Sequence, residues 1–125
     1  MTETLYQVIG EKGIESLLND FYDCVFSNEK LLPLFQKTER NIIQQKQIMF
    51  ISQFLGGPMR YTNTYGPPQM RQRHLPHKIT PSGSVAWLGC MKKAVDKQDW
   101  DDRLKEVVYN IFPPIAKHMI NSSDQ

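Results

Sequence analysis

Long hydrophobic runs, internal repeats and low-complexity tracts are all missing from this 125-residue sequence. A membrane-spanning helix needs about 20 consecutive apolar residues, and no segment approaches that length. A basic and then apolar leader with a small-residue cleavage site is also missing, so nothing in the sequence predicts export. We therefore expect one domain over residues 1–125, located in the cytoplasm and without a membrane partner.

Cysteine is scarce, with Cys24 and Cys90 as the two thiols of the chain. Their spacing fits neither a zinc finger nor a motif for covalent cofactor attachment. Both lie in predicted helices among apolar neighbours, where a free cysteine packs as a small hydrophobic residue. In a reducing compartment we expect two buried free thiols, and the sequence leaves a disulfide open as the alternative.

Acidic residues are absent from the whole of residues 41–95, which nevertheless carry seven basic ones. These are Lys46, Arg60, Arg71, Arg73, Lys78, Lys92 and Lys93. Unopposed positive charge favours an anionic partner, although a solvated basic surface is the more common explanation of such a run. The net charge is only +2, a weak electrostatic footprint for nucleic acid, so we expect no nucleic-acid partner.

Strand-like alternation of apolar and polar residues is also missing, and the sequence therefore predicts an all-α fold. Long helices are expected over residues 11–27, 40–55, 80–95 and 101–120. Thr80 and Pro81 form a typical helix start, whereas Gly56-Gly57-Pro58 is a strong terminator. The Pro113-Pro114 pair should kink or split the last helix, because proline lacks the N–H that the helix needs.

Helical periodicity also predicts which side chains the two middle helices bury. For the second helix these are Ile43, Gln47, Phe50 and Phe54. For the third helix they are Val85, Leu88, Met91 and Val95, with Trp87 beside them. Residues 58–80 between these helices show no sustained periodicity and are expected to form a loop, with at most a short helix at Pro68–Arg73. A loop of this length inside a compact domain is usually functional.

Three polar side chains, Tyr22, Gln47 and Trp87, interrupt otherwise apolar helix faces. Taken singly, a tyrosine there usually reaches water or a carbonyl, a glutamine is a boundary residue, and a tryptophan is core volume. A buried polar group without a partner costs about 1–3 kcal/mol, so each needs a partner if it is buried. The alternative hypothesis is that all three point into one cavity and serve a bound ligand.

The segment Arg71-Gln72-Arg73-His74-Leu75-Pro76 is the most informative stretch of the sequence. It places an imidazole among cations in a segment without a carboxylate. Histidine is the usual axial ligand of a haem iron, and cations would suit the haem propionates. His77 is the rival ligand, whereas we expect His118, near the end of the chain, to be structural or solvated.

Six motifs, taken together, resemble the group II truncated haemoglobins over nearly the whole chain. They are Leu5-Tyr6-Gln7-Val8-Ile9-Gly10, Phe21-Tyr22, Leu34-Phe35, Phe54-Leu55-Gly56-Gly57-Pro58 with Tyr61, the His74 segment, and Ala86-Trp87-Leu88. The resemblance implies a globin-like two-over-two helical sandwich that encloses haem b. It also implies that His74 is the proximal ligand of the iron.

The same resemblance assigns further roles around the haem. Tyr22, Gln47 and Trp87 are expected to form the distal network that binds the ligand, with Trp87 also touching the haem. Phe35, Phe50 and Leu55 are expected to pack against it. The expected propionate partners are Lys46, Tyr61 and Arg73.

Ile43 stands where many haemoglobins have a distal histidine, so that role is absent here. The chain departs from the family pattern at two places. His77 stands where members usually carry phenylalanine. Gly66-Pro67-Pro68 stands where family members often carry the sequence Gly-His-Pro, so the loop is expected to differ in its detailed conformation.

We expect a protein that binds dioxygen and other diatomic ligands at a five-coordinate ferrous haem and releases them slowly. The alternative is a redox enzyme, a nitric oxide dioxygenase or a peroxidase-like protein. It would need an external reductase, since no flavin or nicotinamide motif is present. A third possibility is a helical interaction domain without a cofactor. The protein could be a monomer or a homodimer.

Overall fold

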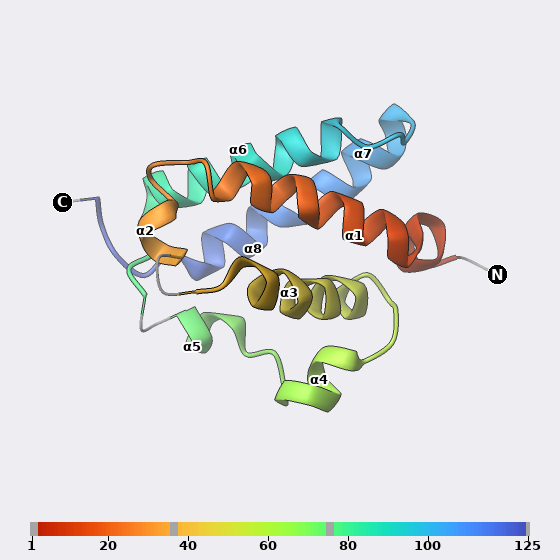
Figure 1. The fold of residues 1–125 in the computed structure, drawn as a ribbon, viewed down its shortest axis with the longest axis horizontal. Helices are drawn as coiled ribbons and strands as arrows, with labels where there is room; N and C mark the ends of the chain where they lie inside the picture. Colours follow the sequence, from red (N-terminus) through yellow and green to blue (C-terminus); the bar gives the residue numbers. More distant parts are fainter. Residues whose placement is uncertain (1–2, 36–37, 75–76, 125) are drawn as a thin grey trace.

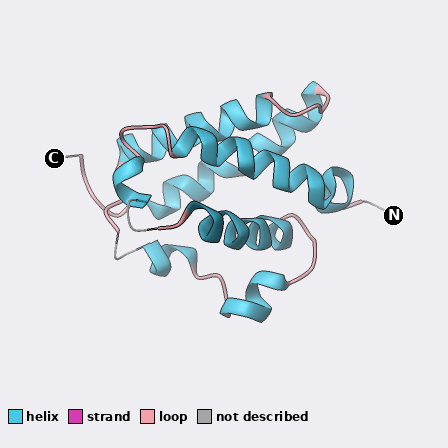
Figure 2. Cartoon of the chain, in the orientation of Figure 1, coloured by secondary structure: helices cyan, strands magenta, loops and turns pink. Residues whose placement is uncertain are grey.

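The computed structural model describes residues 3–35, 38–74 and 77–124. Within that part of the chain it contains eight helices and no strand (Figures 1 and 2). In chain order these are α1 (Leu5–Val25), α2 (Leu32–Phe35), α3 (Arg40–Phe54), α4 (Arg60–Tyr65), α5 (Met70–His74), α6 (Pro81–Asp96), α7 (Asp102–Tyr109) and α8 (Phe112–Met119). The predicted all-α fold is confirmed.

Helices α1, α3 and α6, with the consecutive pair α7 and α8, form the body of the molecule in two layers. Helix α1 packs against α3 in one direction and against α6 in the other, while α6 also packs on α7 and α8. This is the expected two-over-two arrangement, visible in Figure 1 with α4 and α5 lying outside α3. None of the described helices is long and apolar enough to cross a membrane.

Helix α1 begins six residues before the predicted start because a separate turn precedes it. Thr4 caps this turn in a capping box, in which its hydroxyl accepts from the Gln7 amide and the Gln7 side chain accepts from the Thr4 amide. Gly10 then kinks the chain with φ +78°, a left-handed value that favours glycine. Beyond the kink, the apolar stripe of the sequence is buried at Ile14, Leu17, Leu18, Phe21, Tyr22 and Val25.

The faces predicted for α3 and α6 need two corrections. Val85 is 70% exposed and Phe54 is 48% exposed, so neither is a core residue. In α6 the predicted Met91 and Val95 are buried, together with Ser84, Cys90 and Ala94. At about 100° per residue these lie on an arc that leaves Val85 on the opposite side of the helix.

The expectation of two free thiols is also wrong. Cys24 in α1 and Cys90 in α6 form a disulfide, with their Cα atoms 5.4 Å apart. Sequence reasoning could not pair them, because 66 residues separate them and only the packing of α1 on α6 brings them together.

The segment predicted as a loop contains two short helices, α4 and α5, where at most one was expected. The last predicted helix is split into α7 and α8, as its proline pair indicated. Asp101 caps α7 by accepting from the Leu104 amide at 2.7 Å. Pro113 and Pro114 stand in the first turn of α8, where a missing N–H leaves no helical hydrogen bond unmade.

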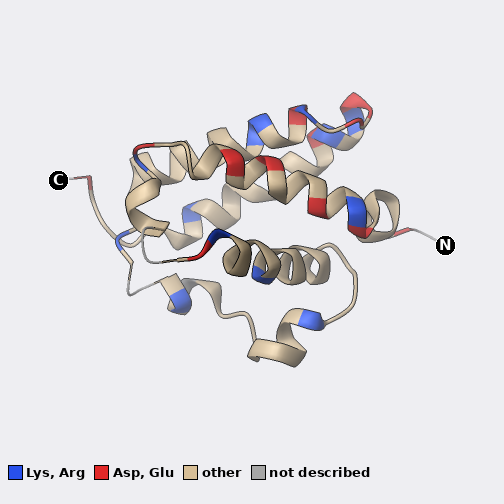
Figure 3. Cartoon of the chain, in the orientation of Figure 1, with Lys and Arg blue, Asp and Glu red and all other residues tan. Residues whose placement is uncertain are grey.

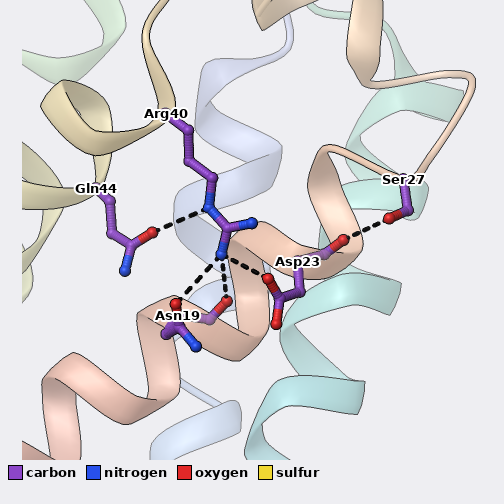
Figure 4. A network of polar contacts seen from close by, with 5 residues as sticks. All are labelled: Asn19, Asp23, Ser27, Arg40 and Gln44. Atoms are coloured by element: carbon purple, nitrogen blue, oxygen red, sulfur yellow. Dashed lines mark hydrogen bonds and ion pairs between the residues drawn. The ribbon is translucent and has the colours of Figure 1, made fainter.

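Arg40, the first residue of α3, ties this helix to α1 (Figure 4). Its Nη2 lies 2.6 Å from the Asp23 carboxylate and donates to the Asn19 carbonyl at 3.0 Å. Its Nε donates to the side chain of Gln44 at 3.2 Å. The network therefore holds the start of α3 against α1.

Charge is unevenly distributed over the elements (Figure 3). Helix α1 carries residues of both signs, whereas the chain from residue 41 to residue 95 carries lysine and arginine without any acidic residue. That stretch includes α4 and α5, which border the cavity described next.

Candidate cofactor-binding cavity

A cavity of about 610 Å³ lies between α1, α3, α5, α6 and α8. Small-molecule and cofactor sites typically enclose about 300–1,000 Å³. Nine of the ten predicted site residues line it: Tyr22, Phe35, Lys46, Gln47, Phe50, Tyr61, Arg73, His74 and Trp87. The fold thus gathers residues that are up to 65 positions apart in the sequence into one site.

Leu55 is the predicted site residue that does not line the cavity. It is the C-cap of α3 and is buried in the main core. Its backbone carbonyl accepts a hydrogen bond from the Tyr6 amide at 3.0 Å. The structure therefore places it in contact with the start of the chain instead of the cavity.

His74 is the last residue of α5, and its ring is held in one orientation. The Nδ1 atom lies 2.6 Å from the carbonyl oxygen of Met70, one helical turn earlier. A carbonyl can only accept, so Nδ1 is the donor, and in the neutral imidazole Nε2 then keeps a free lone pair. This is the tautomer that a metal-binding histidine uses, with its second nitrogen anchored to the backbone.

The other two histidines lie differently. His77 also lines the cavity, with an exposed side chain, and its backbone amide donates to the His74 carbonyl at 2.9 Å. His118 is exposed on α8 and does not line this cavity. Among the described residues, no group of three or more His, Cys, Asp or Glu side chains could hold a metal ion.

Three donors come from the other elements around the cavity: Tyr22 from α1, Gln47 from α3 and Trp87 from α6. Their side-chain polar groups make no hydrogen bond with any described residue. Tyr22 is only 4% exposed, and burial raises the pKa of its phenol. The hydroxyl is therefore protonated and able to donate at physiological pH.

Aromatic contacts hold these donors in place. The Tyr22 ring packs edge-on against Phe21 at 4.9 Å and Phe35 at 6.4 Å between ring centroids. The Trp87 ring packs on Phe21 at 5.0 Å and on Phe112 at 5.9 Å. Rings fixed in this way line the cavity without further loss of rotamer freedom.

The predicted anion partners surround a second part of the cavity. Arg73 lies 5.4 Å from the Tyr61 ring centroid, and its donors bind the backbone carbonyls of Tyr65, Pro67 and Pro68 at 2.6–3.0 Å. Lys46 Nζ lies 4.8 Å from the Tyr65 ring centroid. Both cations line the cavity, and Arg73 also binds the backbone between α4 and α5.

Tyr61 supplies an unpaired hydroxyl at this end. Its side chain is fully buried, and its Oη has no hydrogen-bond partner among the described residues. Burial raises the pKa of this phenol, so it too is a donor. An unpaired buried hydroxyl costs about 1–3 kcal/mol, which indicates that a bound group completes the site.

These features fit a largely apolar cofactor that carries acidic groups and a metal that an imidazole can bind. His74 offers a free lone pair, Tyr61 and Lys46 offer a donor and a cation, and Phe35 and Phe50 offer apolar surface. Sequence reasoning missed Lys30 and Phe112, which also line the cavity. Neither residue stands in a motif that could have identified it.

Comparisons with known proteins give a consistent result. A sequence model of the family described as bacterial-like globin matches residues 4–121. Group 2 truncated hemoglobin YjbI of Bacillus subtilis (strain 168) is 37% identical over 119 residues, which cover 95% of this chain and 89% of the relative.

Solved structures agree with this match. The group II truncated hemoglobin from Bacillus anthracis superposes with a TM-score of 0.94 at 36% identity, covering 100% of this chain and 96% of that one. A truncated oxygen-avid haemoglobin from Bacillus subtilis gives a TM-score of 0.90 at 37% identity, covering 95% of this chain and 100% of that one.

Proposed function

The chain belongs to the bacterial-like globin family, as a group II truncated haemoglobin, and from this we propose that it binds haem b through His74 and holds dioxygen reversibly. Family membership implies haem binding. The finer assignment of each residue is the proposal developed below.

The observation that carries the proposal is the state of the His74 ring. Its Nδ1–H donates to the Met70 carbonyl at 2.6 Å, which leaves Nε2 as the coordinating atom. Haem held by His74 would supply an iron that can bind a diatomic ligand. The hydrogen bond to Met70 holds the ring in place and increases its basicity as a ligand.

Tyr22, Gln47 and Trp87 form the distal side of the proposed site. Each faces the cavity with a donor group that no described residue uses. Donors aimed at a ligand that gains negative charge stabilise it. If each net hydrogen bond contributes about 1 kcal/mol, two donors slow release roughly 30-fold. The oxygen avidity named for the Bacillus subtilis relative supports this direction.

The acidic edge of the haem would lie at Lys46, Tyr61 and Arg73. Tyr61 contributes an unused hydroxyl, and Lys46 contributes a positive charge. Because Arg73 already donates to three loop carbonyls, we assign it the roles of shaping the loop and supplying charge. Phe35 and Phe50 pack against the ring system.

Spectroscopy of His74→Ala tests the proximal assignment. The wild-type protein reconstituted with haem should give a five-coordinate ferrous spectrum and stable oxygenated and carbonyl forms. His74→Ala should lose haem or proximal coordination, whereas His118→Ala, an exposed histidine outside the cavity, should behave as wild type. A normal five-coordinate ferrous spectrum in His74→Ala would overturn the assignment. The variant His77→Ala then shows whether the imidazole of His77 takes the place of His74 as the iron ligand.

The distal donors also support a second candidate function, a redox reaction of the bound ligand. A protein that releases its ligand slowly is better suited to consuming that ligand than to carrying it. The oxygenated protein mixed rapidly with nitric oxide should then form nitrate over many turnovers when an external reductase is supplied. A single stoichiometric turnover under these conditions would favour binding alone.

A further inference from the structure

We propose that Asn121 is a positioning residue that clasps the backbone after His74 and so sets the orientation and retention of the proximal imidazole. The inference rests on the proposed role of His74 as the iron ligand. It adds a residue at the carboxyl-terminal end of the chain, outside the cavity itself.

The side chain of Asn121 bridges three backbone groups of the segment that follows α5. Its Nδ2 donates to the carbonyl of His74 at 3.2 Å and to the carbonyl of His77 at 2.9 Å. Its Oδ1 accepts from the Ile79 amide at 3.0 Å. One side chain thereby connects the carbonyl of the proposed iron ligand with the start of α6.

The backbone around Asn121 reinforces this contact. The amides of Asn121 and Ser122 both donate to the Ile79 carbonyl, at 2.9 and 3.1 Å. The Ser122 hydroxyl donates to Asn121 Oδ1 at 2.8 Å. Asn121 therefore uses both of its amide protons and both acceptor positions, which holds it in one rotamer.

Helix α5 needs such support because it has only five residues. Isolated helices shorter than about 12–15 residues are marginal in water, and a helix end leaves its last carbonyls without intrahelical partners. Helix α5 packs on α8, and Asn121 follows α8 by two residues. The end of α8 and the hydrogen bonds of Asn121 thus fix the position of α5 relative to the rest of the fold.

The imidazole moves with this short helix. Its Nδ1 is bonded to the Met70 carbonyl within α5, so ring and helix form one unit. A shift of the His74 carbonyl would be transmitted to Nε2, the atom that binds the iron. Loss of the Asn121 side-chain hydrogen bonds should weaken the iron–histidine bond and speed haem loss.

Asparagine is chemically specific at this position. The substitution Asn121→Asp keeps the size of the side chain and the acceptor for Ile79, but it sets a carboxylate oxygen against two carbonyl oxygens. We expect this variant to lose haem to excess apomyoglobin at least about 10-fold faster, since two lost hydrogen bonds correspond to roughly 30-fold. Asn121→Ala, which removes the clasp without adding charge, should change the rate in the same direction.

Two further measurements separate positioning from general destabilisation. The iron–histidine stretching band in resonance Raman spectra of the ferrous unliganded protein should shift in Asn121→Asp. The Ile79 amide should exchange hydrogen faster, in the presence or absence of haem. The matched control is Asn110→Asp, because Asn110 is an exposed C-cap residue of α7 whose side chain bonds no described residue.

The outcomes are distinguishable. An unshifted iron–histidine band and unchanged haem loss in both Asn121 variants, with faster Ile79 exchange, would overturn the inference while leaving the proposed function intact. The same changes in Asn110→Asp as in Asn121→Asp would also overturn it. Failure of the wild-type protein to bind haem would overturn the proposed function, and the inference with it.

Discussion

At the scale of single residues, the cavity is defined by polar groups that the protein itself does not satisfy. The hydroxyl of Tyr61 is buried without a partner among the described residues, and Tyr22, Gln47 and Trp87 line the same cavity without hydrogen bonds to described residues. An unpaired buried hydroxyl such as that of Tyr61 lowers the stability of the fold, and a bound group that pairs with it would remove this cost. Binding and stability are therefore coupled at Tyr61.

Replacing Tyr22 by phenylalanine should speed dioxygen release about 5-fold, because it removes one hydrogen bond of about 1 kcal/mol. Trp87→Phe should act in the same direction. Stopped-flow displacement of dioxygen by carbon monoxide measures both rates. Tyr109→Phe on α7, which does not line the cavity, is the control. Unchanged rates in both distal variants would remove the proposed network.

Tyr61→Phe should have opposite effects on the two forms of the protein. Without haem, loss of the unpaired hydroxyl should leave the free energy of unfolding unchanged or raise it by up to about 1–3 kcal/mol. With haem, the variant should lose the cofactor faster, because a propionate partner is gone. Urea denaturation and haem transfer measure the two effects, with the exposed Tyr65→Phe as control. A destabilised apoprotein would show that the hydroxyl has a partner after all.

At the scale of elements, caps and breakers act locally and were predictable. Thr80 caps α6 by accepting from the Gly83 amide at 3.1 Å, and the proline pair divides the last helix. The kink at Gly10 and the helix α4 were not predicted. Helix α4 depends on contacts with another element, since the side chain of Gln53 in α3 binds the backbone amide of Thr62 at 3.0 Å.

The Arg40 network joins two elements and its contribution can be measured. Arg40→Gln should lower the free energy of unfolding by about 1 kcal/mol, because exposed ion pairs contribute little and the bond to the Asn19 carbonyl adds to it. A double-mutant cycle with Asp23→Asn, followed by urea denaturation, should give a coupling below about 1 kcal/mol. A larger coupling would show that the ion pair dominates the network.

At the scale of the whole molecule, the Cys24–Cys90 disulfide joins the two helices that carry Tyr22 and Trp87. It restricts the unfolded chain more than any local contact, because it links residues 66 positions apart. A strongly reducing compartment would keep both cysteines as thiols. The oxidation state of this pair in the cell therefore reports on where the protein works, which the sequence placed in the cytoplasm only by default.

Reduction with dithiothreitol should lower the free energy of unfolding by about 2–4 kcal/mol, according to the chain-entropy account of disulfides. Urea denaturation with and without the reductant measures the difference. The double variant Cys24→Ala, Cys90→Ala should unfold at the same urea concentration under both conditions. Equal stability of the wild-type protein in both conditions would contradict a bond that stabilises the fold.

Much of the candidate site could be predicted because Tyr22, Phe35, Tyr61, Arg73, His74 and Trp87 stand in short motifs, and the orientation of the His74 ring follows from ordinary metal-site chemistry. Leu55 was assigned to the site by its place in a motif, yet it caps α3 and packs in the core. The hydrogen bonds of the Asn121 side chain correspond to no sequence motif. It exists only because the chain after α8 returns to the loop after α5, 47 residues away from His74.

The sequence by itself determined the helical periodicity, the Thr80 cap, the split of the last helix and the chemical character of the site, since these depend on neighbouring residues and on residue type. Only the tertiary structure decided that Cys24 and Cys90 are bonded and that Asn121 supports the segment carrying His74. These features need contacts between distant parts of the chain, and such contacts leave no periodic or local trace in the order of the residues.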